Sequence, residues 1–209
     1  AIPFVSRDYA HYSSPKLEKL IKEAGISIVR MDLSWDVIEK SKGEYNFSST
    51  GYDKLTNSLI KNELRPYFIL DYSNTLYEKN KSITTKEGLK AFNNFVDQAT
   101  SRYSGNHIIW EIWNEPNIDF WQPKPNYNEY SNLVKSVSKT IRKNDPTATI
   151  VAPALAGLNA DSLKWLEEII DKGTLKYIDD VSVHPYRESP PETAIQDYYY
   201  LKKLIIRAC

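Results

Sequence analysis

The sequence predicts an α/β fold built on one parallel sheet. Short runs of β-branched residues alternate along the chain with longer amphipathic segments, and this order is typical of βαβ units. Hydrophobic residues make up 41% of the chain and charged residues 26%, which is enough apolar material for one sizeable core. No linker or low-complexity stretch interrupts the alternation. We therefore expect residues 1–209 to form a single domain.

Six strands are expected. The first, over residues 2–6, is weak because Pro3 cannot donate a hydrogen bond to a neighbouring strand. The other five are short and mostly apolar, and most of them run into polar or aromatic residues. They cover residues 26–32, 65–71, 107–113, 149–153 and 178–184.

Six helices are expected, each after one of the strands. In the first, Leu17, Leu20 and Ile21 lie on one face, and Gly25 follows its end. Pro146 ends the fourth helix. A loop with Lys42-Gly43-Glu44 precedes the second. The helices cover residues 15–23, 52–62, 85–103, 127–144, 162–171 and 193–207.

The element order alone allows two parallel architectures. A doubly wound open sheet can stop at six strands, whereas a closed barrel needs eight. No G-x-G-x-x-G motif follows the first strand, and the chain has only 7 glycines. These observations argue against a dinucleotide-binding fold, but the choice of architecture depends on the ends of the strands.

Composition also limits the partners. Lys and Arg together number 27, as do Asp and Glu, so no net charge attracts nucleic acid or an anionic membrane. No apolar run approaches the ~20 residues of a membrane span, and no signal peptide is visible. Cys209 is the only cysteine, and the histidines show no metal-ligand spacing. We expect no metal, no cofactor, and neither a nucleic-acid nor a membrane partner.

The carboxyl ends of the expected strands carry dense groups of polar and aromatic residues, where parallel α/β folds place their chemistry. The fourth is the most informative, because Pro116 forces the chain to turn just after Asn114 and Glu115. A carboxyl group held there beside indole rings is partly desolvated, which favours the protonated form that a general acid needs. Asn114 can bond a sugar hydroxyl.

The string Ile109-Trp110-Glu111-Ile112-Trp113-Asn114-Glu115-Pro116-Asn117 resembles the acid/base motif of clan A glycoside hydrolases. It looks most like family 39, with family 5 second. The blocks around Arg30 after strand 2, around Asp71 after strand 3, and Ser182-Val183-His184-Pro185-Tyr186 after strand 6 resemble their counterparts. The resemblance implies a TIM (β/α)₈-barrel fold, present here as an incomplete barrel of about six βα units.

The resemblance also implies roles for particular residues. Glu115 matches the general acid/base, Asn114 the residue that holds the substrate 2-hydroxyl, and Arg30 the arginine that orients the nucleophile. An alternative for Arg30 is a structural ion pair with Asp32, Asp71 or Glu111. His184 and Tyr186 match residues that line the sugar site, although a hydrogen-bonded core histidine is equally compatible with the sequence.

Three more residues complete the expected sugar-binding set: Trp35, Trp121 and Asp71. The two indoles are candidate stacking platforms, with Trp121 favoured because it lies in the loop after strand 4. Core packing is the alternative for Trp35, as it is for Trp113.

Retaining hydrolysis needs a second carboxylate about 5–5.5 Å from the first. In the resembling family it follows strand 7, but the sequence offers one helix after His184 and neither strand 7 nor strand 8. The expectation is a domain derived from a retaining β-glycosidase acting on a polysaccharide or oligosaccharide, truncated and lacking the nucleophile. Whether it is an active enzyme is uncertain.

Other possibilities stay open. The chain could be an inactive carbohydrate-binding remnant, or a scaffold or assembly fragment. Asp32 or Asp71 could activate water in an inverting reaction. Open barrel edges at strands 1 and 6 invite a second copy or a partner segment. Family resemblance slightly favours a secreted or periplasmic location.

Overall fold

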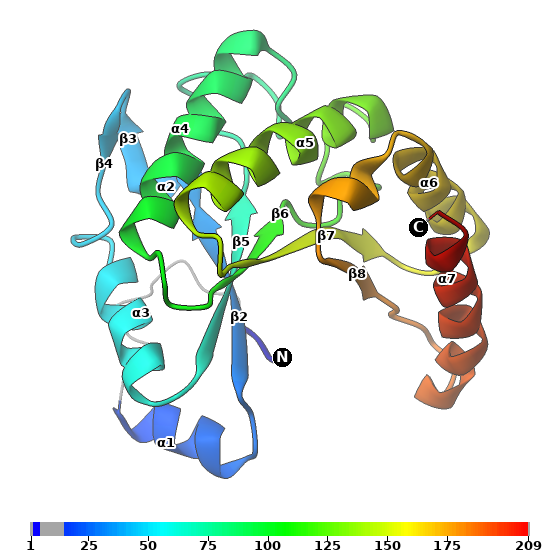
Figure 1. The fold of residues 1–209 in the computed structure, drawn as a ribbon, viewed down its shortest axis with the longest axis horizontal. Coiled ribbons are helices and arrows are strands. Elements are labelled where there is room, and N and C mark those ends of the chain that lie inside the picture. The colour runs from blue at the N-terminus through cyan, green and yellow to red at the C-terminus, as the bar shows by residue number, and fades with distance from the viewer. Residues whose placement is uncertain (1, 5–14, 209) are drawn as a thin grey trace.

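A computed structural model describes residues 2–4 and 15–208. Its main feature is a parallel sheet of six strands in the order β1-β2-β5-β6-β7-β8. The sheet curves around a central space, and Figure 1 shows the helices as an arc outside it. The strands are β1 (Ile2–Phe4), β2 (Ile28–Ser34), β5 (Arg65–Asp71), β6 (Ile109–Ile112), β7 (Thr149–Ala156) and β8 (Asp180–His184). The predicted incomplete (β/α) barrel is confirmed.

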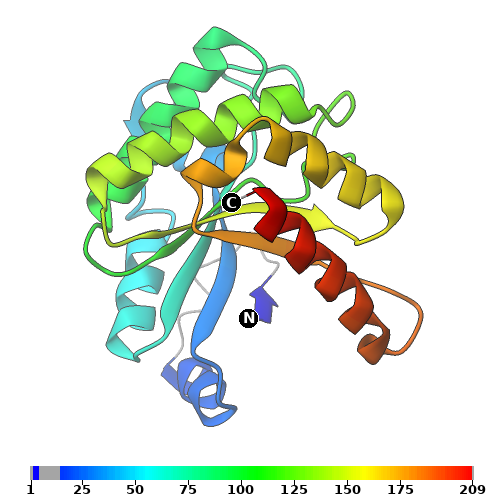
Figure 2. The ribbon, with the colours of Figure 1, turned by 45° about the vertical axis from the view of Figure 1, so that its right-hand side comes forward.

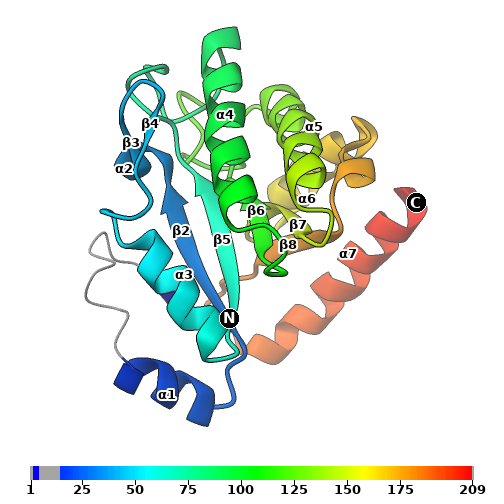
Figure 3. The same cartoon turned by 60° about the vertical axis from the view of Figure 1, so that its left-hand side comes forward.

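The helices all lie on the outer face of the curved sheet (Figure 2), and Figure 3 shows α3, α4 and α5 on the same side of the strands. Their bounds differ by at most two residues from those expected. They are α1 (Pro15–Glu23), α3 (Tyr52–Lys61), α4 (Lys86–Arg102), α5 (Tyr127–Asn144), α6 (Ala160–Asp171) and α7 (Ala194–Ala208). Short 3-10 turns, η2 (Thr174–Tyr177) and η3 (Pro191–Thr193), precede β8 and α7.

Side chains of β2 alternate between the two faces of the sheet. Val29, Met31 and Leu33 are buried in the core between sheet and helices, whereas Arg30 and Asp32 point to the inner face and are only partly buried. The period of two along a strand thus separates an apolar outer face from a polar inner one. In the register of the sheet, Asp32 pairs with a residue of β5 that in turn pairs with one of β6, so polar groups of neighbouring strands share levels.

Two features differ from the expectation. Strand β2 begins two residues later than expected and ends at Ser34, after which α2 (Trp35–Ile38) forms at once. The expected loop around Gly43 is an antiparallel hairpin of β3 (Glu39–Ser41) and β4 (Glu44–Tyr45). The hairpin follows from the positive φ of Gly43, which suits a tight turn and which glycine adopts without strain.

The two outer strands of the sheet each have one neighbour within the described residues: β1 pairs with β2, and β8 pairs with β7. Strand β8 is also the least buried of the strands whose exposure the structure gives; none of its residues is fully buried. No helix in the described part of the chain is long and apolar enough to span a membrane.

Candidate active site

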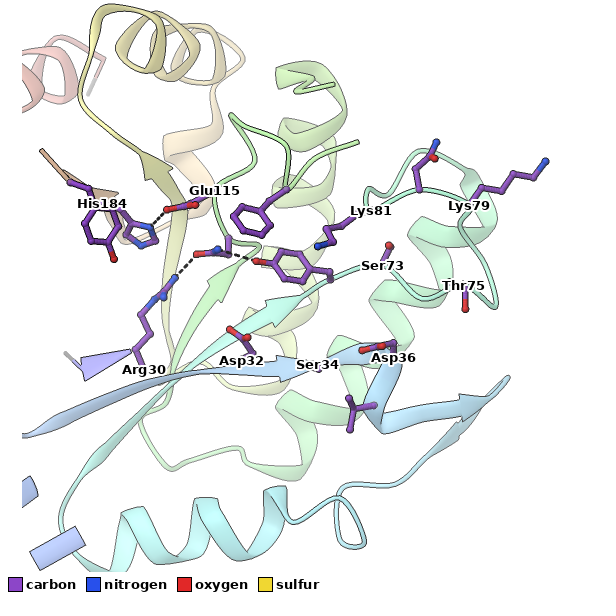
Figure 4. A pocket seen from close by; sticks show the side chains of 16 residues that line it. Arg30, Asp32, Ser34, Asp36, Ser73, Thr75, Lys79, Lys81, Glu115 and His184 are labelled. Carbon is purple, nitrogen blue, oxygen red and sulfur yellow. Dashed lines mark hydrogen bonds and ion pairs between the residues drawn. The ribbon is translucent and has the colours of Figure 1, made fainter. Parts of the chain in front are cut away.

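A cleft of about 660 Å³ opens at the carboxyl ends of the strands, a size typical of ligand sites. Figure 4 shows its lining side chains, which come from four segments that follow strands in the sequence or form their ends. They are Arg30, Asp32, Ser34, Asp36 and Val37 from β2 and α2; Tyr72, Ser73, Thr75, Lys79, Asn80 and Lys81 after β5; Asn114, Glu115 and Phe120 after β6; and His184 and Tyr186 at and after β8.

Glu115 and His184 face each other across one end of the cleft (Figure 4). The carboxylate Oε1 lies 2.7 Å from the ring Nδ1, and both side chains are mostly buried. The hydrogen bond can form with the proton on either partner: a neutral carboxyl donates to the ring, and an ionised one accepts from it. This arrangement fixes the direction of the carboxyl while its protonation state changes.

The backbone around Glu115 is strained. Glu115 has a φ of 52° and Trp113 a φ of 69°, both in the left-handed region that residues other than glycine seldom occupy. Each such residue costs about 1–3 kcal/mol, and the surrounding structure must hold it. Two backbone bonds do so: Glu115 N donates to Ala154 O of β7 at 3.2 Å, and Trp113 N donates to Leu70 O of β5 at 3.2 Å.

Arg30 connects the floor of the cleft to its wall. Its Nε donates to Glu111 Oε2 at 2.8 Å, and its Nη2 donates both to the same oxygen and to Asn114 Oδ1, the latter at 2.9 Å. Tyr67 donates to the other oxygen of Glu111 at 2.7 Å. Of the three carboxylates considered for Arg30, Glu111 is thus the observed partner, and the pair aims the amide of Asn114.

Asn114 also donates through Nδ2 to the hydroxyl of Tyr72, 2.9 Å away. Because both its oxygen and its nitrogen are engaged, the amide cannot rotate freely, and its orientation is defined. Tyr72 itself stacks on Phe120, with ring centroids 5.6 Å apart and planes 8° from parallel. This stacked pair forms the aromatic wall of the cleft, opposite β2.

Burial changes the ionisation of two inner-face carboxyl groups. It raises the pKa of Asp32, which Arg30 opposes. Burial raises the pKa of Asp71 well above its usual value, and the charge of Asp32 adds to the effect. Both oxygens of Asp71 are enclosed and have no hydrogen-bond partner among the described residues. Asp71 is therefore best described as a neutral carboxylic acid in the core.

The structure brings five of the eight expected site residues together in the cleft: Arg30, Asn114, Glu115, His184 and Tyr186. Tyr186 is the most exposed of these, with 81% of its surface accessible, and its ring lies 6.1 Å from that of His184. His184 is therefore a cleft residue, which settles the choice left by the sequence in favour of the lining position.

The other three expected residues require a correction: Trp35, Trp121 and Asp71 are fully buried and do not line the cleft. Trp35 stacks on Tyr77 behind the sheet, and its indole donates to Glu39. An indole enclosed on both faces has none to offer a sugar ring, so the core-packing alternative applies to Trp35.

Trp121 is enclosed in the same way. It packs against Trp113 and Tyr130, with ring centroids 5.0 and 5.9 Å away. The loop that was expected to carry a stacking platform does reach the cleft, but with Phe120 rather than Trp121. The aromatic composition of the loop indicated the right segment; which ring faces out depends on how the loop packs against α5.

Tyr72 and Lys81 were missed in the sequence. Tyr72 had a usable signal, because it follows Asp71 directly at a strand end, where parallel folds gather their functional groups. Lys81 had none, since it lies ten residues beyond the strand. Within the described residues, no group of three or more His, Cys, Asp or Glu side chains is placed to hold a metal ion.

The chain can now be compared with known proteins. Residues 3–197 match the model of the family described as cellulase (glycosyl hydrolase family 5). Two curated β-xylosidases are similar in sequence: that of Geobacillus stearothermophilus is 24% identical over 174 residues, and that of Caldicellulosiruptor saccharolyticus 25% over 195. The matches cover 75% and 82% of this chain but 33% and 38% of those proteins, so the chain spans about a third of their length.

Solved structures show the same fold. A monomeric β-xylosidase from Caulobacter crescentus CB15 superposes with a TM-score of 0.74 at 17% identity, covering 98% of this chain and 48% of that one. Xylanase 10B from Thermotoga petrophila, solved with xylobiose, gives 0.68 at 14% identity, over 98% of this chain and 66% of that one.

The fold and these matches define a glycoside hydrolase of clan A, as the resemblance in the sequence indicated. Within it, the chain belongs to the cellulase family, glycosyl hydrolase family 5. Family 39, the first resemblance, is represented among the similar structures by an enzyme from Xanthomonas axonopodis pv. citri, with a TM-score of 0.71, 18% identity, and coverage of 98% of this chain and 47% of that one.

Proposed function

We propose that this chain carries the sugar-binding cleft and the proton-donating carboxyl group of a retaining β-glycosidase. The observation that carries the proposal is the position of Glu115: it lies on the cleft wall, oriented by His184, with Asn114 beside it. A general acid must be held within reach of the bond that it protonates, and here the strained backbone and the hydrogen bond hold it.

The proposed step starts with Glu115 protonated. As the bond between the anomeric carbon and the leaving oxygen breaks, its electron pair goes to that oxygen, which takes the proton from Glu115. In the second half of the reaction, the carboxylate of Glu115 removes a proton from the attacking water. Because His184 can either accept from Glu115 or donate to it, the contact can persist through both halves.

Asn114 would bind the hydroxyl next to the anomeric carbon, where contacts strengthen in the transition state. Its amide is prepared for this role, because Arg30 and Tyr72 fix its orientation before any sugar binds. Arg30 acts here as a positioning residue. Such preorganisation removes the need to order the amide during the reaction.

The nucleophile needs a separate proposal. Of the cleft's other carboxyl groups within the described residues, Asp32 and Asp36 belong to β2 and α2, across the cleft from Glu115 (Figure 4). We infer that the second carboxylate of a retaining pair would be supplied next to the free edge of β8. This placement leaves the 209 residues with the acid/base half of the site.

For the substrate we propose a β-linked xylose oligosaccharide. The support is the similarity to proteins described as β-xylosidases and to a xylanase solved with xylobiose. A cleft of this size, open to solvent and lined by Tyr72, Phe120 and Tyr186, suits a chain of sugars whose apolar faces meet aromatic rings.

The test compares two leaving groups. A xyloside of p-nitrophenol needs protonation as it leaves much more than one of 2,4-dinitrophenol does. We expect Glu115→Gln to lower kcat/KM for the first by about 100-fold or more, and far less for the second. An equal loss on both substrates would rule out proton donation by Glu115.

Binding is measured alongside turnover, by quenching of tryptophan fluorescence with xylo-oligosaccharides. Saturable binding without turnover of either xyloside would instead support the carbohydrate-binding alternative. Absence of both binding and turnover would support a scaffold or assembly fragment and contradict the proposal.

A further inference from the structure

Lys81 is a cation in the cleft to which the proposed reaction assigns no role. It lies in the loop between β5 and α4, and its side chain lines the cleft at the end away from His184 (Figure 4). Its ammonium group sits over the aromatic wall, 4.7 Å from the ring centroid of Tyr72 and 5.1 Å from that of Phe120. A cation held within about 6 Å of a ring face is attracted by the electron-rich face.

The position of Lys81 is fixed at both ends of the residue. Its backbone oxygen accepts a hydrogen bond from Gln122 N at 2.9 Å, which joins its loop to the loop that carries Phe120. Its ammonium rests on the two rings of the stacked pair. A lysine on the surface usually samples many rotamers, whereas this one has two contacts that keep its charge at the cleft.

The charge of Lys81 is not matched by a protein group. Within the described part of the chain, no carboxylate lies within ion-pair distance of its Nζ, and no acceptor bonds to it. The cleft's other inward cation, Arg30, is by contrast neutralised by Glu111. The acidic residues Asp32 and Asp36 come from β2 and α2, across the cleft from Lys81 (Figure 4).

An ammonium held in place without a partner is suited to bind an anion. Because aromatic rings cover one side of it, less water competes there than around a fully exposed lysine, which strengthens its attraction for a negative group. A carboxylate is the matching group on a sugar, and uronic acids carry one. An uncharged xylose unit offers hydroxyls only and would gain little from the charge.

We propose that Lys81 forms a subsite for a carboxylated sugar unit, so that the cleft prefers oligosaccharides bearing a uronic acid. The proposal rests on the proposed glycosidase function and adds the class of substrate. The uronic acid is a branch or a neighbouring unit, bound on the aromatic wall, while the bond to be cleaved lies at Glu115.

The test measures affinity in the Glu115→Gln background, so that no sugar is consumed. Two probes are titrated by calorimetry at low salt: a xylotetraose with one glucuronic acid branch, and the same oligosaccharide with an uncharged glucose branch. We expect the acidic probe to bind about tenfold more tightly, and the preference to shrink in 0.5 M salt because the interaction is between charges.

Three further variants locate the effect. Lys81→Gln is expected to abolish the preference, and Lys81→Arg to retain it. Lys42→Gln is the matched control: Lys42 also holds its ammonium 4.7 Å from a tyrosine ring, that of Tyr77, but lies outside the cleft. It is expected to keep the preference. Melting temperatures of all variants verify that they are folded.

Equal binding of the two probes would overturn the Lys81 subsite and leave the glycosidase proposal intact. A preference that survives Lys81→Gln would also overturn it, because another group would then bind the carboxylate. Binding of neither probe would overturn both proposals.

Discussion

Arg30 shows how one residue can serve both structure and function. It bonds Glu111, which is fully buried, and Asn114, which faces the cleft. A buried ion pair adds little to stability relative to apolar residues, but removing one partner leaves an uncompensated charge and is strongly destabilising. The pair therefore fixes the amide of Asn114 at a geometry that a neutral contact would hold less firmly.

Asp71 is a residue whose ionisation is predicted to oppose folding. Its pKa lies well above the ordinary 3.8 because of burial and the nearby charge of Asp32. In the unfolded chain it ionises near its ordinary value, so the folded state binds the extra proton over the interval between the two values. Stability therefore falls as pH rises above 3.8, and the loss ends only when pH passes the raised value.

We expect Asp71→Asn to remove this pH dependence. The amide has nearly the same shape, so its effect on packing is the same at every pH. The difference in melting temperature, variant minus parent, should therefore become more positive between pH 4 and pH 8. Parallel melting curves across that range would contradict the raised pKa.

Asp53→Asn provides a control of opposite sign. A hydrogen bond from Arg102 lowers the pKa of Asp53 to about 2, against the opposing effect of burial. Its stabilisation is present above the unfolded value of 3.8 and is lost as pH falls toward 2. The same difference in melting temperature should become more negative as pH rises from 2 to 5.

At the scale of elements, the N-terminus of α4 depends on a buried glutamate outside the helix. Glu78 accepts hydrogen bonds from the backbone N–H groups of Thr84 and Thr85, at 3.0 and 2.8 Å, and from the Thr85 hydroxyl. Thr85 in turn caps the helix by accepting from Gly88 N. The carboxylate thereby orders the segment that connects the Lys81 loop to α4.

Gly88 lies in the first turn of α4 because Glu78 occupies the space beside it. A Cβ at Gly88 would lie 2.0 Å from Glu78 Oε1. Alanine favours a helix over glycine by about 1 kcal/mol. Displacing Glu78 breaks bonds to a charged group, which are worth about 1.5–3 kcal/mol each. We expect Gly88→Ala to lower the free energy of unfolding by about 2 kcal/mol, measured by urea denaturation.

The control uses the background Glu78→Ala, which removes the obstructing carboxylate. There Gly88→Ala should be neutral or slightly stabilising, because only the helix preference of alanine is left. The same loss in both backgrounds would mean that the contact between the two residues does not explain the glycine.

At the scale of the whole molecule, the sheet is unevenly protected. All four residues of β6 are buried, whereas none of the residues of β8 is fully buried. Strand β8 has one neighbour among the described strands, so one of its edges can open without disturbing a second ladder. The part of the cleft that His184 contributes therefore belongs to the least protected strand.

Hydrogen exchange tests this gradient. The hydrogen-bonded amides of β8 should exchange at least about tenfold faster than those of β5 and β6, which should open only with global unfolding. The expected second copy or partner segment on the open edge is tested by the same measurement. Protection of β8 that rises with protein concentration would support a second copy; uniform protection at all concentrations would contradict the gradient.

The sequence was most informative where a local pattern has a local cause. Strand β5 and helices α1 and α5 have the bounds that were expected, because hydrophobic periodicity and proline positions act within the segment itself. The strand-end rule likewise indicated Glu115, Asn114, Arg30, His184 and Tyr186. Each of these lies at or just after the carboxyl end of a parallel strand, or faces inward from one.

Tertiary structure decided which side chain of a locally similar pair faces the cleft. Phe120 and Trp121 are neighbours of similar character, yet only Phe120 lines the cleft, since Trp121 is held in the core by Trp113 and Tyr130. Lys81 reaches the cleft because two loops far apart in sequence join through one backbone hydrogen bond. Sequence patterns determine the elements, but contacts between segments distant in the chain determine the cleft's walls, because those contacts depend on the packing of the whole sheet and its helices.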